Sequence, residues 1–287
     1  ADVVRFLEQA TMGPTEELVA HVSSVGFAKY LDEQLSAPVS SYPDLPAMPA
    51  NQAVGCPDGS ATTCVRDNYT MYPLQVRFFQ NALTGEDQLR QRVALALHEI
   101  LVVSGVTIRQ PSAMGPYLNM LQRDALGSYR TLLHDLTVSP AMGDYLDMVN
   151  NPAATAPAFI PPNENYAREL LQLFSVGVDL LDEDGTPKRD ASGEPLPAYD
   201  QETIEELARV FTGWTYATMP GAAPRKSNPP NYKAPMWLYR DALGADTTHD
   251  KGSKSLLAYA GAPHPVLAAS QDGAVDLDQA LDDVFEH

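Results

Sequence analysis

Apolar residues recur at helical spacing in two long segments of the chain. In the segment 86–103 the apolar positions are three or four residues apart, which places them on one helix face: Leu89, Val93, Ala96, Ile100 and Val103. In the segment 163–178 (NENYARELLQLFSVGV) the corresponding positions are Leu170, Leu171, Phe174 and Val178. Both patterns predict amphipathic helices that bury this face in a core.

Residues that favour helix ends mark the limits of these and other helices. Glu86 and Asp87 suit the positive N-terminal end of the helix that follows them, and Gly177 favours a helix stop. Asp200 or Thr203 can cap a helix over residues 204–214. Further helices are expected within residues 2–35, 68–84 and 113–148, and from about residue 276 onward. The predicted fold class is mainly α: a single multi-helix domain over residues 1–287, with long Pro/Gly-rich loops and a few short strands or hairpins.

Three segments interrupt the helical pattern. Residues 36–67 form an excursion rich in Pro, Ser and Gly, and they contain both cysteines. Residues 179–200 (DLLDEDGTPKRDASGEPLPAYD) consist of turn-forming residues and predict a hairpin-like insertion. Residues 215–273 are aromatic-rich and irregular, with a strand candidate at residues 236–240. We expect these segments to form loops around the helices.

Cys56 and Cys64 are the two cysteines of the chain. Pro57, Gly59 and Ser60 lie between them, and such a flexible short loop can bring the two sulfurs within bonding distance. The alternative is two free thiols, whereas a zinc site is disfavoured because no second Cys or His pair lies nearby at ligand spacing. The sequence therefore predicts a local disulfide, which favours the periplasm or the exterior.

The charge of the chain excludes some classes of partner. The 287 residues include 37 Asp plus Glu against 19 Lys plus Arg, a net charge of -18. Nucleic-acid binding requires a basic surface, and docking on an anionic membrane face does too. The longest apolar stretch, residues 93–103, contains His98 and Glu99 and is too short to cross a bilayer. We expect a globular protein with no nucleic-acid partner and no membrane insertion.

The chain resembles a known bacterial family through several motifs in order: RFLEQATMGPT, QLRQRVALALHEILVVSGV, NENYARELLQLFSVGV, ETIEELARVFTGW and HDKGSK. The family is catalogued as domain of unknown function 1800, and the resemblance covers nearly the whole chain. It implies a secreted or periplasmic bacterial protein, often encoded beside a partner of the sulfatase-like class. It supplies no established activity.

The resemblance also bears on the limits of the domain. Members of the family continue past the point that matches VFEH, so the resemblance implies that the chain is the front portion of a longer domain. The remainder of that domain would then be a partner of any site that it completes. Residues 1–20 lack the basic and uninterrupted apolar regions of a signal peptide, so we expect a mature or trimmed form.

A polar cluster at the start of the 163–178 helix is the most informative candidate site. Glu164 and Arg168 are four residues apart, as are Asn165 and Glu169, so each pair lies along one helix face. One interpretation is helix capping with a structural ion pair. In the other, Glu164 or Glu169 is a general acid or base, and Asn165 and Arg168 bind the substrate.

Two further clusters allow similar alternatives. Glu205 and Arg209 are four residues apart on the next helix, where they would form part of a buried structural network or of a cleft that binds a sugar or an anion. His249 precedes Asp250 in the loop TTHDKGSK, where we expect the histidine to be exposed and oriented by Asp250. The alternative for this loop is a surface turn that Asp250 caps.

Two weaker signals concern a metal and a stacking surface. Asp182, Asp184 and Asp190 suggest a weak calcium candidate, although the segment lacks the closing Glu of a calcium loop and also fits a hairpin turn. Trp214 and Trp237 belong to an aromatic-rich region that either packs on the core or offers a stacking platform for sugar rings. Calcium is the only cofactor that the sequence suggests.

These features lead to two functional hypotheses. The first is carboxylate-assisted hydrolysis of carbohydrate or another extracellular polymer, with Glu164 or Glu169 as base, Arg168 and Arg209 positioning the substrate, and the 249–250 pair assisting. The second is a non-catalytic binding or assembly protein of the cell envelope, in which the same charges form structural ion pairs.

Overall fold

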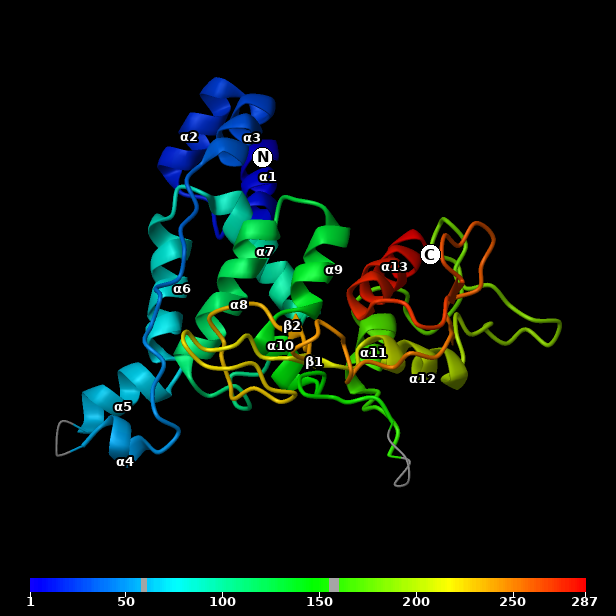
Figure 1. Cartoon of the computed structure of the whole chain (residues 1–287). Coiled ribbons are helices and arrows are strands. Elements are labelled where there is room, and N and C mark those ends of the chain that lie inside the picture. Colours follow the sequence, from blue (N-terminus) through cyan, green and yellow to red (C-terminus); the bar gives the residue numbers. More distant parts are fainter. Residues whose placement is uncertain (58–60, 155–159) are drawn as a thin grey trace. The chain divides into compact units, whose positions relative to one another are not determined.

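The computed structural model describes residues 1–57, 61–154 and 160–287. It consists mainly of helices with a few two-residue strands, so the predicted mainly α class is confirmed (Figure 1). The chain, for which the sequence predicts a single domain, consists of two compact units, Ala1–Leu132 and Leu133–His287. Within the described residues, no helix has the length and apolarity needed to cross a membrane.

The first unit begins with three short helices around an apolar cluster. Its helices are α1 (Asp2–Ala10), α2 (Glu16–Val25), α3 (Phe27–Ser36), α4 (Gln52–Gly55), α5 (Ala61–Tyr69), α6 (Tyr72–Thr84), α7 (Gln88–Ile100) and α8 (Pro111–Asp124). Thr15 caps α2 by accepting a hydrogen bond from the Leu18 backbone. Leu7, Val22 and Tyr30 are buried together and join α1, α2 and α3.

The buried face of α7 differs from the apolar stripe expected there. Ala96 and Ile100 are exposed, whereas Asp87 and Gln91 are buried. Gln91 donates to the Asp87 carboxylate at 2.9 Å and accepts a hydrogen bond from Gln122 of α8 at 2.8 Å. The expectation for these two positions is wrong because paired polar groups, rather than apolar periodicity, decide which face of α7 is buried.

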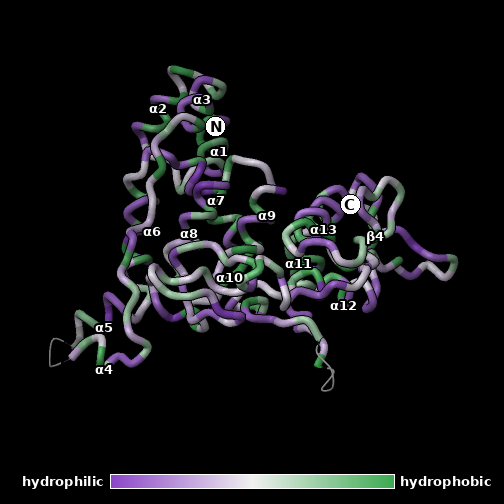
Figure 2. Tube along the Cα trace, in the orientation of Figure 1, coloured by the Kyte–Doolittle hydropathy of each residue, from purple (hydrophilic) through white to green (hydrophobic). Residues whose placement is uncertain are grey.

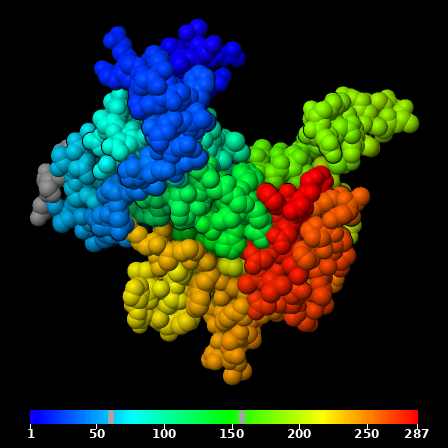
Figure 3. Space-filling view, turned by 90° about the horizontal axis from the view of Figure 1, so that it is seen from above, coloured from blue at the N-terminus to red at the C-terminus, as the bar shows by residue number. Residues whose placement is uncertain are grey.

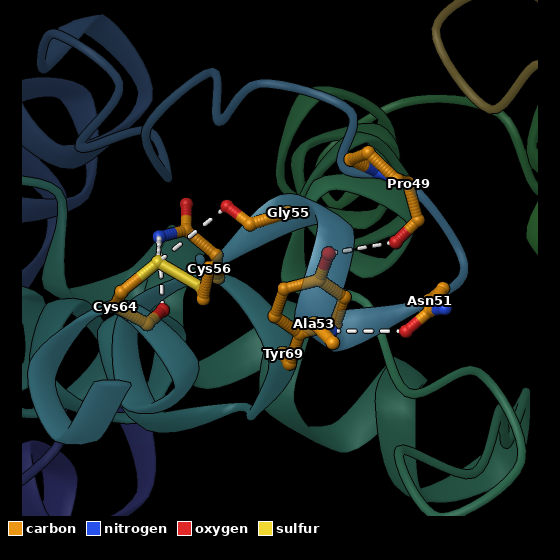
Figure 4. Close-up of a disulfide and its surroundings, with 8 residues drawn as sticks. Pro49, Asn51, Ala53, Gly55, Cys56, Cys64 and Tyr69 are labelled. Atoms are coloured by element: carbon orange, nitrogen blue, oxygen red, sulfur yellow. Dashed lines mark hydrogen bonds between the residues drawn. A yellow bond between two sulfur atoms is a disulfide. The ribbon is translucent and has the colours of Figure 1, made fainter. Parts of the chain in front are cut away.

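The predicted disulfide is confirmed between Cys56 and Cys64, whose Cα atoms are 5.9 Å apart (Figure 4). It joins the end of α4 to α5. Tyr69, at the end of α5, donates a hydrogen bond to the carbonyl of Pro49 at 2.7 Å. Residues 58–60 of the cysteine loop lie outside the described residues. The disulfide and Tyr69 together hold α4 and α5 against each other.

The second unit consists of short helices surrounded by irregular loops. Its elements are the end of α9 (Tyr129–Thr137), α10 (Pro140–Tyr145), α11 (Asn165–Gln172), α12 (Gln201–Val210), β1 (Trp214–Thr215), β2 (Trp237–Leu238), β3 (Lys254–Ser255), β4 (Val266–Leu267) and α13 (Gly273–Glu286). The strand β1 pairs antiparallel with β2, and β3 pairs antiparallel with β4. The predicted strand at residues 236–240 is therefore present, reduced to the two residues of β2.

The sequence locates the starts of α11, α12 and α13 near their observed positions, but α11 and α12 end at Gln172 and Val210, before the expected ends at Gly177 and Trp214. Leu170, Leu171 and Phe174 are buried as expected, whereas Val178 is exposed because α11 ends at residue 172. Asp200 caps α12, and α13 begins a few residues earlier than expected because Asp272 caps it. Figure 2 shows hydrophobic and hydrophilic residues alternating along most helices, as amphipathic helices require.

The 179–200 segment forms three short extended stretches joined by two turns. Backbone bridges join residues 179 and 197, 181 and 187, and 189 and 195. Gly185 and Gly193 take positive φ values of 83° and 89° at the two turns, a conformation that glycine adopts without steric cost. The segment projects from the second unit into solvent, as the yellow-green lobe in Figure 3 shows.

Candidate functional site

A polar cavity of about 550 Å³ lies in the second unit. Its lining residues come from three parts of the chain: Asp144, Asp147, Val149 and Asn150 at and after the end of α10, Tyr216 after β1, and Arg225, Ser227, Asn228, Pro229 and Pro230 in the loop before β2. Cavities that bind small ligands measure about 300–1,000 Å³. The size and the charged lining make this cavity the best candidate site of the unit.

An unusual backbone turn presents two of the lining side chains. Asp147 and Asn150 take φ values of 57° and 61°, and they are two of the three described non-glycine residues with positive φ. Such a conformation costs about 1–3 kcal/mol and is concentrated at functional sites. The turn is held by its backbone, since the N–H of Val149 bonds to Gly143 and that of Asn150 to Trp214. The strain is therefore maintained beside the cavity.

A tyrosine pair holds the first carboxylate. Tyr232 donates a short hydrogen bond to Oδ2 of Asp144, and the rings of Tyr216 and Tyr232 lie 5.6 Å apart at an angle of 66°. Burial, reinforced by the bond to Asp144, raises the pKa of Tyr232 to about 12. Burial also raises the pKa of Tyr216 strongly. Both phenols stay protonated at neutral pH, so Tyr232 remains a donor to the carboxylate.

The loop that forms the opposite wall is fixed by Asn228. This buried residue donates from its backbone to the Thr215 hydroxyl at 2.9 Å and from its side chain to the Tyr216 carbonyl at 2.8 Å. Its side-chain oxygen accepts the backbone N–H of Arg225 at 3.1 Å. Thr215 donates in turn to Asn150 at 2.6 Å. The two walls of the cavity are thus joined through side chains at β1.

The cluster at the start of α11 forms a half-buried ion pair that also contacts Gln201 of α12. Arg168 donates to Glu164 at 2.8 Å, as its spacing predicts, and also contacts Gln201 at 3.1 Å. Gln201 donates to Glu164 at 2.9 Å and to Glu205 at 3.1 Å. None of these four side chains lines the cavity described above. Their arrangement agrees with the interpretation in which Glu164 and Arg168 form a structural ion pair at the start of α11.

Asn165 and Glu169 point to different surroundings. Asn165 donates to Asp147 at 3.4 Å, so it is the sequence-predicted residue that contacts a carboxylate of the cavity. Oε2 of Glu169 is buried and has no hydrogen-bond partner within the described part of the chain. The two residues, four apart in α11 as the spacing predicts, therefore differ in their hydrogen-bond partners.

Arg209 of α12 takes part in a network of ion pairs, one of the two alternatives expected for it. It bonds to Glu206 and, at 2.9 Å, to Asp250, whereas Glu205 accepts a hydrogen bond from Gln201. Asp250 comes from a later loop, so the spacing within α12 does not predict this partner. Only the tertiary structure brings that loop to α12.

His249 is buried, contrary to the exposure expected for its loop, with only 3% of its surface accessible. Its Nδ1 faces the Thr212 carbonyl at 2.9 Å, and its Nε2 faces Oδ2 of Asp276 at 3.0 Å. Lys254, which is also buried, donates to the same Asp276 oxygen at 2.7 Å. A β carbon at Gly273 would lie 2.7 Å from the His249 ring, so the ring packs directly against the backbone of Gly273 and leaves no room for a side chain there.

We call this set the buried ion network; its members are Glu206, Arg209, His249, Asp250, Lys254 and Asp276. Burial alone would raise the pKa of Asp276, but hydrogen bonds from His249 and Lys254 outweigh it and lower that pKa. Bonds from Arg209 and the Gly252 backbone similarly overcome burial and lower the pKa of Asp250. Both carboxylates are held ionised by partners from the protein itself.

The remaining candidates have structural contacts. Asp184 and Asp190 accept backbone hydrogen bonds that close the two turns of the 179–200 segment, and Asp182 lies 3.7 Å from Lys188. In the described residues, no three His, Cys, Asp or Glu side chains are grouped to hold a metal ion. Trp214 is buried in β1, which pairs with β2, the strand that contains Trp237. Neither tryptophan lines the cavity.

Sequence reasoning missed the carboxylates of the cavity. Asp144, Asp147 and Asn150 occur at intervals of three residues in GDYLDMVNN, immediately before Pro152. Asp147 and Asn150 are a usable signal, because they follow the end of a short helix and belong to the residue types that, after glycine, most readily adopt positive φ in a turn. No sequence signal indicates that Tyr232 and Asn228 belong to the cavity, since they are distant in the sequence from Asp144 and Asp147.

Comparison with known proteins supports the motif-based resemblance. Residues 5–287 match the family model described as "Protein of unknown function (DUF1800)". No curated protein and no solved structure matches the chain. Since the match extends over almost all residues, the chain belongs to the family of proteins of unknown function DUF1800.

Proposed function

We propose that this protein hydrolyses a carbohydrate or a related extracellular polymer, with Asp144 and Asp147 as the acid–base carboxylates. The observation that supports the proposal is the polar cavity that these two side chains line together. Glycoside hydrolysis commonly uses two carboxylates, one on each side of the bond that breaks. The proposal keeps the reaction class expected from the sequence and moves it away from Glu164 and Glu169, which do not line the cavity.

The two carboxylates differ in a way that suits a division of roles. Asp144 accepts a hydrogen bond from Tyr232, which fixes its orientation. Asp147 is exposed and sits on a strained turn, where its carboxylate accepts a hydrogen bond from Asn165. We therefore assign the base or nucleophile to the oriented Asp144, with Asp147 as the second carboxylate of the pair.

A location outside the cytoplasm is part of the proposal. The Cys56–Cys64 disulfide is compatible with the periplasm or the exterior, because disulfides persist in oxidising compartments. Extracellular polysaccharides are accessible to a protein in either place.

The test is hydrolysis of a panel of extracellular polysaccharides, measured as new reducing ends. Asp144→Asn and Asp147→Asn should each lower the rate by about 10²–10⁴-fold, the usual contribution of a general acid or base. Glu164→Gln is the matched control, since it also replaces a carboxylate by an amide but lies in a half-buried ion pair outside the cavity. Equal losses in all three variants, or full activity of Asp144→Asn, would contradict the assignment.

The second candidate function is a non-catalytic binding or assembly protein of the cell envelope. The observation that favours it is that the other charged candidates are engaged with one another: Glu164, Arg168, Arg209 and Asp250 are all in ion pairs. In this case the protein would bind a polysaccharide without releasing reducing ends, and Asp144→Asn would lower the affinity alone.

A further inference from the structure

The loop that forms one wall of the cavity has the opposite charge to the rest of the chain. No Asp or Glu occurs between Glu206 and Asp241, although the chain contains 37 of them. The same stretch contains Arg225, Lys226 and Lys233 in the loop before β2. Arg225 lines the cavity, facing a lining that includes two aspartates.

Arg225 and Lys226 are also distinguished by their lack of partners. Within the described residues of the second unit, the side chain of neither makes a hydrogen bond or an ion pair. The paired cations of this unit include Arg168, Arg209, Arg240, Lys251 and Lys254, each of which contacts a carboxylate. Asp144 and Asp147 line the same cavity, yet no ion pair joins them to Arg225. These cations are therefore available to a ligand.

The backbone of the loop at Arg225 is fixed before any ligand binds. The Arg225 backbone N–H donates to Asn228, which is buried and anchored to Thr215 and to the Tyr216 carbonyl. Pro229 and Pro230 follow Asn228 immediately, and their fixed φ angles stiffen the loop. The exposed side chain of Arg225 therefore extends from a fixed backbone, and a ligand that it binds does not have to order the loop.

The net charge of -18 opposes the approach of an anion, but it acts at long range. At physiological ionic strength charges are screened beyond about 8 Å. A direct contact between a guanidinium and a carboxylate or sulfate is a short-range, charge-assisted hydrogen bond and is screened much less. At the cavity wall, the attraction between Arg225 and an anionic group in direct contact is therefore stronger than the repulsion from distant acidic residues.

We infer that the substrate of this cavity is an anionic saccharide. Its acidic group, a carboxylate or a sulfate or phosphate ester, contacts Arg225 at the cavity wall, while its hydroxyls donate to Asp144 and Asp147. Lys226, the next residue of the loop, adds positive charge beside this contact without lining the cavity. This inference rests on the proposed function and adds the substrate class.

Equilibrium binding of the full chain to matched oligosaccharides tests the inference. The probes are oligogalacturonate and its methyl ester, and a sulfated oligosaccharide with its desulfated counterpart, each measured by calorimetry. We expect an anionic member to bind about tenfold or more tightly than its neutral counterpart, as one charge-assisted contact provides. The two anionic arms distinguish a carboxylate from a sulfate as the recognised group.

Variants separate this inference from the proposed function. The double variant Arg225→Ala with Lys226→Ala should abolish the preference for the anionic probe and leave binding of the neutral one unchanged. The double variant Lys188→Ala with Arg189→Ala controls for the loss of two positive charges, since both residues are exposed in the 179–200 segment. If the neutral probe binds as tightly as the anionic one, or the double variant keeps the preference, the inference is overturned and the proposed function stands. If no saccharide of either kind binds, both are overturned.

Discussion

The cavity and the buried ion network, both in the second unit, use the same kinds of side chain in opposite ways. In the ion network Asp276 accepts hydrogen bonds from His249 and Lys254, and all three residues are buried. In the cavity Arg225 is unpaired and Asp147 is exposed on a strained turn. Buried charges are stable only when the protein pairs them, so unpaired charges remain where solvent, or a ligand, can complete them.

Removal of the central carboxylate of the ion network should have the largest effect on stability. Asp276→Ala leaves His249 and Lys254 buried without their shared acceptor, which should cost about 3–5 kcal/mol of the free energy of unfolding. Urea denaturation measures the loss. Asp278→Asn, at an exposed position of the same helix, should change stability by less than about 0.5 kcal/mol. Equal effects of the two variants would show that the network is not structural.

A methyl group added at Gly273 tests how closely His249 is packed. The β carbon would lie 2.7 Å from Cγ and 2.8 Å from Nδ1 of the ring, so Gly273→Ala should destabilise the protein by about 1–3 kcal/mol. The control is Gly127→Ala, where the nearest described atom would be at an ordinary 3.4 Å. Thermal unfolding of both variants checks this, and an unchanged Tm for Gly273→Ala would mean that the ring can move.

Two buried aspartates of α13 should respond to pH with opposite signs. The pKa of Asp276 is lowered, so its contribution to stability is present above about pH 4 and is lost as the pH falls through the lowered value. Burial raises the pKa of Asp283, so its contribution is present below about pH 4 and is lost as the pH rises through the raised value.

Asp283→Asn isolates the second of these contributions. The variant should gain stability relative to the original chain as the pH rises from 4 to 8, by about 1.4 kcal/mol for each unit of pKa shift removed. Denaturant unfolding at several pH values measures the difference. A difference that is constant with pH would contradict a raised pKa for Asp283.

The smallest effect is expected at the strained turn of the cavity. Asp147→Gly should raise the free energy of unfolding by up to about 1 kcal/mol, because glycine adopts positive φ without steric cost. Ser270→Gly, at a φ of 65° outside the cavity, should give a similar gain. Saccharide binding should fall only in Asp147→Gly. Loss of binding in both variants would place the ligand elsewhere.

Local rules account for much of the helical framework. The caps at Thr15 and Asp200 and the apolar positions Leu170 and Leu171 follow from side-chain chemistry and spacing within one helix. The Cys56–Cys64 disulfide also follows from a short loop. Expectations fail where partners come from elsewhere, as at Ile100, which is exposed because the buried Asp87 and Gln91 occupy the inner face of α7.

The sequence by itself determined the mainly α class, the family, the disulfide and the acidic charge, because each depends on composition, spacing or motif order. Only the tertiary structure decided which charges are buried in pairs and which line a cavity. Asp250 bonds to Arg209 across 41 residues, and Tyr232 bonds to Asp144 across 88. Spacing within a helix carries no information about such distant partners, and those partners decide whether a charge supports the fold or is available to a ligand.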